Sequence, residues 1–255
     1  MSDSRLEDLA RALGTAWAEA RAVPAPSTVE PSLTAEQAYE IQEMVVEERM
    51  RGGRERAGWK MGLTTAQPPT TPIVGTLLSD MVIATESELY VGSMVAPMVE
   101  AELVVRIGAK IDRPQTVGEL EKGPHQVGPG LEVIDYRTTD STGVVDWIAD
   151  NSTVAYAVVG EFKTVTKPGP ADVTATLYGD GERLASGTGR QVMGNPLAAV
   201  AWLSGHLSER GLTLEKDHVV LTGSLTGHHP VPQGADSEFT ADFGTLGSVG
   251  VNFHA

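Results

Sequence analysis

The stretch MVEAELVVRI, residues 98–107, decides the fold. Apolar residues recur in it at every second position, which is the period of a β-strand that buries one face. The buried face is predicted to carry Val99, Ala101, Leu103, Val105 and Ile107. The same alternation predicts that Glu100 and Glu102 lie together on the opposite face of the strand.

These two glutamates are candidate metal ligands. Side chains two residues apart on a strand lie on one side, with Cα atoms about 7 Å apart, so their carboxylates can converge on one cation. A solvated polar face is the alternative, but Met98 and Val104 make this face partly apolar. A third carboxylate, Glu132, lies in the apolar stretch LEVID (131–135). Because buried like charges are costly unless a cation neutralises them, the three carboxylates predict a Mg²⁺ or Mn²⁺ site.

One lysine lies in an unusually apolar context. Lys60 stands between Trp59 and Met61 in GWKMGLT. The formal net charge is -15, so an anionic substrate would need a local positive charge, which Lys60 could supply. The alternative is a strand lysine whose ammonium reaches solvent. If Lys60 is not involved, Arg137 and Arg190 are the next candidates for binding a substrate carboxylate.

The composition excludes several classes of protein. A charge of -15 disfavours nucleic acid and anionic membranes as partners. The 255 residues include no cysteine, which excludes disulfides, zinc–thiolate sites and cysteine nucleophiles. No stretch approaches the roughly 20 apolar residues of a membrane span, and the N-terminus has no apolar signal core. We therefore expect a cytoplasmic protein.

The order of elements predicts an α+β fold in one structural unit. Residues 1–56 are expected to form a helical N-terminal arm, with one helix capped by Ser4 and a second by a Thr34–Gln37 capping box. Residues 57–255 are expected to form a strand-rich body interrupted by one helix, which Asn195 caps. Besides 98–107, strands are predicted at 131–134, 153–159, 173–178, 218–222, 238–243 and 248–253.

Other motifs are less specific. Gly187-Thr188-Gly189 precedes a helix but lacks the spacing of a dinucleotide-binding loop. The pair His228-His229 is interpreted as part of a turn over 227–230 rather than as a metal site, because adjacent strand residues point to opposite faces. Ser224 is not in a nucleophile elbow. The stretch DNS at 150–152 is either a polar turn or an element that positions an active-site group.

Seven motifs together resemble a known family. They are GWKMGLT, PMVEAEL, LEVID, IADNS, GNPLAAVAWL, VVLTGSLTG and GTLGSVGVNF. With these motifs in this order, the chain is similar to 2-oxopent-4-enoate (2-hydroxypentadienoate) hydratases and 4-oxalocrotonate decarboxylases of the fumarylacetoacetate hydrolase superfamily, from about residue 34 to the C-terminus. The resemblance implies a mixed β-roll with peripheral helices, which is usually a homo-oligomer.

The resemblance also implies roles for individual residues. It implies that Mg²⁺ or Mn²⁺ is held by Glu100, Glu102 and Glu132. It implies catalytic roles for Lys60, Asp80, Asp150 and Asn151. It implies substrate contacts for Lys60, Leu78, Thr222, Gly223 and Ser224. Two segments that border the substrate in the family are shortened here, namely TAQPPTTPIVG (65–75) and YRTTDSTGVVDWI (136–148).

The function implied is hydration of a small anionic 2-hydroxy-2,4-dienoate to a 4-hydroxy-2-oxo acid. The substrate's carboxylate and 2-oxygen would chelate the metal, which would stabilise the developing enolate charge. Decarboxylation of a 2-oxo-3-enedioate of the 4-oxalocrotonate type needs the same charge stabilisation and is the first alternative. Acylpyruvate-type hydrolysis and a non-catalytic metabolite-binding protein are the others.

Overall fold

The computed structural model describes residues 3–65, 70–141, 143–164 and 169–255. Its α-helices are α1 (Asp3–Glu19), α2 (Pro26–Val29), α3 (Ala35–Arg51), α4 (Val117–Lys122), α5 (Val144–Ala149) and α6 (Pro196–Glu209). None of the helices in the described ranges is long and apolar enough to cross a membrane.

The strands form two large sheets and one short pair. The nine-stranded sheet has the order β3-β2-β13-β6-β7-β9-β4, with β10 paired to β7 and β14 paired to β6. Its strands are β2 (Arg56–Gly62), β3 (Ile73–Leu78), β4 (Val82–Ala84), β6 (Pro97–Arg106), β7 (Gln126–Asp135), β9 (Val154–Val159), β10 (Lys163–Thr164), β13 (Val219–Ser224) and β14 (His229–Pro230).

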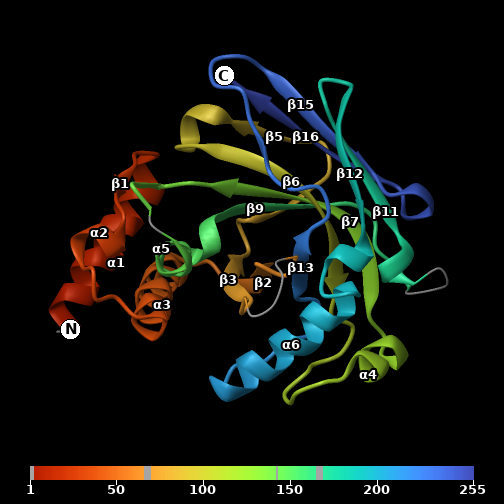
Figure 1. Cartoon of the computed structure of the whole chain (residues 1–255), viewed down its shortest axis with the longest axis horizontal. Coiled ribbons are helices and arrows are strands. Elements are labelled where there is room, and N and C mark those ends of the chain that lie inside the picture. The colour runs from red at the N-terminus through yellow and green to blue at the C-terminus, as the bar shows by residue number, and fades with distance from the viewer. Residues whose placement is uncertain (1–2, 66–69, 142, 165–168) are drawn as a thin grey trace.

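The five-stranded sheet has the order β12-β11-β15-β16-β5, and β1 pairs with β8. The strands of these two sheets are β1 (Val23–Pro24), β5 (Ser87–Tyr90), β8 (Thr138–Thr139), β11 (Thr174–Gly179), β12 (Glu182–Thr188), β15 (Ser237–Asp242) and β16 (Ser248–His254). Figure 1 shows α1 to α3 gathered at one side of the sheets and α4 and α6 together at another. Strand-rich layers with peripheral helices confirm the predicted α+β fold.

The main core lies on the apolar face of β6. Val99, Ala101 and Leu103 are fully buried there, in one cluster with residues of the five-stranded sheet and of α6. The partners include Leu177, Phe239, Val251, Phe253, Leu197, Val200 and Leu203. Packing of one face against this core leaves the opposite face of β6, which carries the glutamates, free to form a site.

The N-terminal helices pack onto the body through a second apolar cluster. Leu9 and Leu13 of α1 and Ile41 of α3 share this cluster with Ile73 of β3 and Ile148 of α5. The N-terminal helices also make a polar contact with the body. The buried side-chain amide of Gln42 in α3 donates hydrogen bonds to the carbonyls of Val74 and Ile148. The division into an arm (1–56) and a body (57–255) stays a prediction.

Local signals located the starts of α3 and α6, but the predicted Ser4 cap was wrong because α1 already begins at Asp3, and the body contains α4 and α5 besides the one helix predicted. Thr34 and Gln37 form the predicted capping box at the start of α3, and the Asn195 side chain accepts a hydrogen bond from the Leu197 amide at 3.0 Å. The turn predicted over 227–230 was wrong at its end, since His229 and Pro230 pair with Val99 and Met98 as β14. A two-residue strand has no periodicity, and its partner lies some 130 positions earlier in the chain, so no local pattern could reveal it.

Candidate active site

Three carboxylates converge at the pairing of β6 with β7. The register places Glu100 directly opposite Glu132, so both side chains lie on one face, and Glu102 follows two residues along β6. Carboxylate oxygens of the three residues all lie within 4.8 Å of one another. Glu102 and Glu132 are completely buried, whereas Glu100 retains some exposure. The convergence predicted from strand parity is therefore present in the structure.

These carboxylates lack the partners that buried charges normally have. Among the described residues, Glu102 Oε1 and both oxygens of Glu132 accept no hydrogen bond, although Lys60 Nζ lies 3.3 Å from Glu132 Oε1. Burial, reinforced by Glu132 and Glu100, raises the pKa of Glu102 well above its ordinary value. Burial also raises the pKa of Glu132 to about 7. An all-oxygen set with unbonded buried oxygens fits a hard divalent cation, because such a cation would neutralise the charges.

Lys60 lies beside this cluster and is almost completely buried. Its ammonium donates a hydrogen bond to the Ser152 carbonyl at 2.8 Å, in addition to the ion pair with Glu132. Only 7% of Lys60 is exposed, so its burial does not support the alternative of a strand lysine that reaches the protein surface. Burial lowers the pKa of Lys60, but Glu132, Glu100 and Glu102 outweigh that effect and raise it above its ordinary value. In the metal-free protein the three glutamates therefore favour the charged form of Lys60.

A cavity of about 330 Å³ connects these groups to the surface. This volume lies at the lower end of the range for small-molecule sites. Its polar lining includes Lys60, Glu100, Glu102, Thr64, Tyr136, Gln191, Ser224 and His228. Its apolar lining includes Leu63, Ile73, Ile134 and Trp147. The cavity therefore combines an ionic end with an apolar wall, as a short, partly unsaturated acid would require.

Both shortened segments contribute to the cavity. Thr65 and Ile73 line it from the first segment, of which residues 66–69 lie outside the described residues. Tyr136 and Trp147 line it from the second.

Of the predicted substrate contacts Thr222, Gly223 and Ser224 at the end of β13, the last two line the cavity. Gly223 donates its amide to Glu102 Oε2 at 2.7 Å, and its φ of 124° favours glycine. A Cβ added there would lie 1.7 Å from Thr64 Oγ1. Ser224 also lines the cavity. Thr222 does not: it is fully buried, and its hydroxyl donates to the Leu103 carbonyl, so its position does not support the substrate contact predicted for it.

Asp150 and Asn151 lie behind the cavity wall. Asp150 is ion-paired with Arg137 at 2.8 Å. The Asn151 amide exchanges two hydrogen bonds with the backbone of Thr76. Neither side chain lines the cavity, whereas the next residue, Ser152, does. The position of both residues supports a role in holding the loop and not the direct catalytic contact that was predicted.

Asp80 and Leu78 are not brought to the cavity either. Asp80 is partly exposed and forms ion pairs with Arg49 and Arg54. Leu78 is buried in an apolar cluster and does not line the cavity. The reason is the pairing of β2 with β3, which places Gly75 opposite Lys60 but Leu78 opposite Arg56, at the far end of the strand.

The two alternative arginines do not face the substrate site. Arg137 is 1% exposed and contacts protein groups behind the cavity. Arg190 is exposed and paired with Asp172. Neither lines the cavity, so neither is placed to bind a substrate carboxylate.

The sequence patterns missed His228. Its Nδ1 lies 3.7 Å from Glu100 Oε1, and its ring meets Tyr136 edge-on with centroids 6.3 Å apart. The pairing of β14 with β6 causes this, because His229 lies opposite Val99 and so places His228 next to Glu100. Lys60 and His228 are the two residues of the described cavity lining that can carry a positive charge.

Metal binding should depend on pH, because the carboxyl groups must lose protons to act as ligands. The pKa of Glu132 is raised to about 7 in the metal-free protein, and that of Glu102 is also raised. Between about pH 4.3 and about 7, the folded protein therefore keeps protons that the unfolded chain has lost. The stability of the metal-free fold should fall as the pH rises through this range.

We expect the affinity for Mn²⁺ to rise about tenfold per pH unit below pH 7 for each proton displaced. Titration calorimetry in buffers of different ionisation enthalpy would count the released protons. An affinity that is constant between pH 5.5 and 8 would contradict the expectation.

The chain is similar to curated hydratases along nearly its whole length. The chain is 30% identical to the 2-keto-4-pentenoate hydratase of Paraburkholderia phymatum, over 98% of both chains. It is 29% identical to the 2-oxo-hept-4-ene-1,7-dioate hydratase of Escherichia coli, over 96% of both.

A solved structure is similar over the whole chain. It is 4-oxalocrotonate decarboxylase from Pseudomonas putida G7, complexed with magnesium and adipate. The TM-score is 0.93 at 25% identity, and the match covers 100% of this chain and 99% of that one. Residues 53–253 match the fumarylacetoacetate (FAA) hydrolase C-terminal family. As the sequence motifs predicted, the chain belongs to the fumarylacetoacetate hydrolase family.

Proposed function

We propose that this chain is a divalent-metal-dependent hydro-lyase. It adds water to a 2-hydroxy-2,4-dienoate of the 2-oxopent-4-enoate type and produces a 4-hydroxy-2-oxo acid. The observation that carries the proposal is the group of three converging carboxylates beside Lys60, two of them buried with unbonded oxygens, in a small cavity with an apolar wall. Support comes from the two hydratases to which the chain is similar along nearly its whole length.

Glu100, Glu102 and Glu132 would hold Mg²⁺ or Mn²⁺. The similar decarboxylase structure contains magnesium. When bound, the cation would supply Lewis acidity that stabilises negative charge on the substrate's 2-oxygen. The Gly223 amide holds Glu102 in place, so the carboxylate needs little reorganisation during the reaction.

The chain's own residues would bind and orient the substrate. Lys60, fixed between Glu132 and Ser152, offers a positive charge to the substrate carboxylate or transfers a proton to the dienoate. The side chains of Leu63, Ile73 and Trp147 form an apolar surface against which the unsaturated chain can pack.

Decarboxylation is the second candidate, and the similarity to 4-oxalocrotonate decarboxylase favours it. Both reactions need the same stabilisation of dienolate charge, so the charged groups do not discriminate between them. The two activities differ in product. Incubation with a 2-hydroxy-2,4-dienoate and, separately, with a 2-oxo-3-enedioate, followed by NMR, would reveal either a 4-hydroxy-2-oxo acid or loss of CO₂.

A cytoplasmic location and a homo-oligomeric state complete the proposal. Light scattering coupled to size-exclusion chromatography would test the oligomeric state, and a monomer under assay conditions would contradict that part.

Removal of the metal should abolish turnover. After exhaustive EDTA treatment and desalting, we expect no measurable activity, with recovery on addition of Mg²⁺ or Mn²⁺ and less recovery with Zn²⁺, because an all-oxygen site favours hard cations. The control is the same protein carried through desalting without EDTA. Full activity after chelation would refute the metal-dependent mechanism.

A further inference from the structure

The loop that contacts Lys60 has an unfavourable backbone conformation. Asn151, Ser152 and Thr153 have φ values of 51°, 51° and 61°, which is the left-handed region. L-residues other than glycine adopt this region at a cost in free energy, and a run of three is unusual. All three residues are buried. Such a run persists only where the surrounding structure holds it in place.

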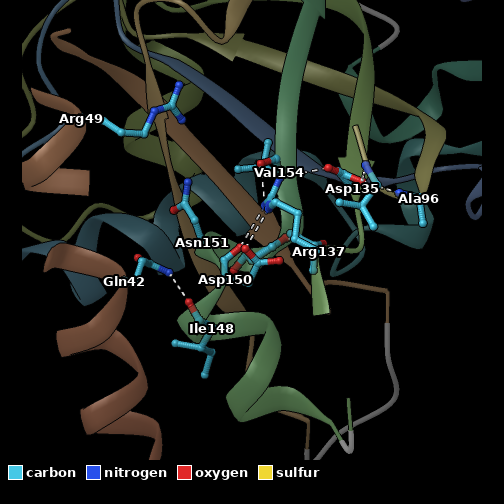
Figure 2. Close-up of polar contacts among 12 residues, drawn as sticks. Gln42, Arg49, Ala96, Asp135, Arg137, Ile148, Asp150, Asn151 and Val154 are labelled. Atoms are coloured by element: carbon cyan, nitrogen blue, oxygen red, sulfur yellow. Dashed lines mark hydrogen bonds and ion pairs between the residues drawn. The ribbon is translucent and has the colours of Figure 1, made fainter. Parts of the chain in front are cut away.

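Arg137 joins the two ends of this run (Figure 2). Its Nε donates a hydrogen bond to Asp150 Oδ1 at 2.8 Å, and its Nη2 donates to the Asp150 carbonyl at 3.2 Å. The same Nη2 donates to the Val154 carbonyl at 3.1 Å. One planar guanidinium therefore contacts the residue just before the run and the residue just after it. A lysine, with a single ammonium, could not reproduce this arrangement.

The strained run positions two groups of the cavity. The Ser152 carbonyl accepts the hydrogen bond from Lys60, and Ser152 and Thr153 both line the cavity. The Thr153 amide donates back to the Asp150 carbonyl at 2.8 Å, which closes the loop. A relaxed backbone would move the Ser152 carbonyl and, with it, the ammonium of Lys60.

Arg137 is itself held by the N-terminal helix. Its guanidinium carbon lies 4.2 Å from the ring centroid of Trp17 in α1, and Arg49 of α3 lies over the same ring at 3.9 Å. Asp135 lies 3.8 Å from Arg137 Nη1 and accepts hydrogen bonds from the amides of Val95 and Ala96. The ring of Trp17 and the Asp135 carboxylate thus hold the guanidinium in the protein interior.

We infer that Arg137, supported by Trp17, is a positioning residue that holds the 151–153 loop in its strained form and thereby places Lys60 for the reaction. The inference rests on the proposed function only in the role of Lys60; the clamp on the loop is a separate structural claim. The contact between Trp17 and Arg137 would give α1 a role in catalysis, although α1 contributes no residue to the described cavity lining.

The substitution Arg137→Lys tests the clamp while it keeps the charge. We expect faster hydrogen exchange in the peptide that covers residues 150–154, and a fall in kcat of about tenfold to a hundredfold, the size expected for a misplaced reacting group. The dissociation constant for Mn²⁺ should stay within about twofold, because Arg137 contacts none of the three glutamates. The control, Arg190→Lys, alters an exposed, ion-paired arginine and should leave exchange and kcat unchanged.

A second pair of variants tests the helix. Trp17→Leu removes the aromatic face but retains an apolar side chain, and Trp202→Leu makes the same change at another half-buried helical tryptophan, which stacks on His206. We expect Trp17→Leu to increase exchange at 150–154 and to lower kcat, and Trp202→Leu to do neither. Equal losses in both variants, in step with their melting temperatures, would show a general effect of stability and overturn the role of Trp17.

The outcomes distinguish failure of the Arg137 clamp from failure of the proposed hydro-lyase function. Unchanged exchange at 150–154 in Arg137→Lys would overturn the clamp whatever the activity. Faster exchange with unchanged kcat would overturn the positioning role. If Arg137→Lys does not fold, Trp17→Leu supplies the same two measurements. A wild-type protein without turnover on any dienoate would refute the proposed function, while the exchange data would still decide the clamp.

Discussion

Glu132→Gln should lower turnover by about a thousandfold or more and remove tight Mn²⁺ binding, because the Lewis acid it helps to hold supplies several kcal/mol of charge stabilisation. Glutamine has nearly the same shape but no charge. It would leave the cation with two carboxylates and would place a neutral amide against Lys60, which now lies 3.3 Å from Glu132 Oε1.

The effect on stability should have the opposite sign. Glu132 is completely buried and its oxygens accept no hydrogen bond from described residues, so its charge is costly in the metal-free protein. In EDTA at pH 8, we expect the free energy of unfolding of Glu132→Gln to equal or exceed that of the wild type. The measurements are kcat with Mg²⁺, Mn²⁺ binding by electron paramagnetic resonance, and denaturant unfolding.

A matched control is Glu238→Gln, on the exposed face of β15. It should change neither kcat nor Mn²⁺ affinity. Tight Mn²⁺ binding in Glu132→Gln would show that the ion is held elsewhere and would remove the central element of the proposed site.

Lys60→Ala should lower turnover by more than about a hundredfold, the range for loss of an acid–base or charge-stabilising group. The effect of Lys60→Ala on Mn²⁺ affinity should differ from that of Glu132→Gln. Removal of a buried cation leaves the net charge of the ionised site more negative, so Mn²⁺ affinity at pH 8 or above, where the carboxyl groups have lost their protons, should be unchanged or higher. Measurement of kcat and of the Mn²⁺ dissociation constant on the same preparation distinguishes loss of the proton donor or carboxylate-binding group from loss of the metal.

Lys110→Ala is the control for Lys60→Ala, since Lys110 forms an exposed ion pair with Glu215. A wild-type rate in Lys60→Ala, with normal metal affinity, would remove Lys60 from the mechanism. Arg137 and Arg190 would not replace it, because neither lines the cavity. His228 would then be the remaining residue of the described lining that can carry positive charge.

The roles implied for Asp80, Leu78, Asp150, Asn151 and Thr222 show where sequence motifs stop being informative. Asp150, Asn151 and Thr222 each lie within two positions of a residue that lines the cavity, whereas Leu78 and Asp80 lie further along the chain from the lining residue Ile73. Thr222 precedes Gly223, and Asn151 precedes Ser152. A motif identifies the segment, but the direction of each side chain depends on backbone angles and strand register. At residues 151–153 those angles are in the left-handed region, which no pattern of residue types predicts.

Features that depend on near neighbours along the chain could be predicted from the residues alone. The alternation in 98–107 determined which face of β6 is buried, because side chains alternate along any strand. The caps at Thr34 and Asn195 determined where α3 and α6 begin, because those hydrogen bonds span two or three residues. The apolar neighbours of Lys60 indicated burial for the same local reason.

Only the tertiary structure decided which groups meet. Glu132 lies opposite Glu100 because of the register between β6 and β7, and Lys60 reaches Glu132 from β2, two strands away from β6. His228 lies beside Glu100 because β14 pairs with β6. The physical reason is that strand register is set by packing and hydrogen bonding over the whole sheet, and a shift of one residue would turn every side chain to the other face.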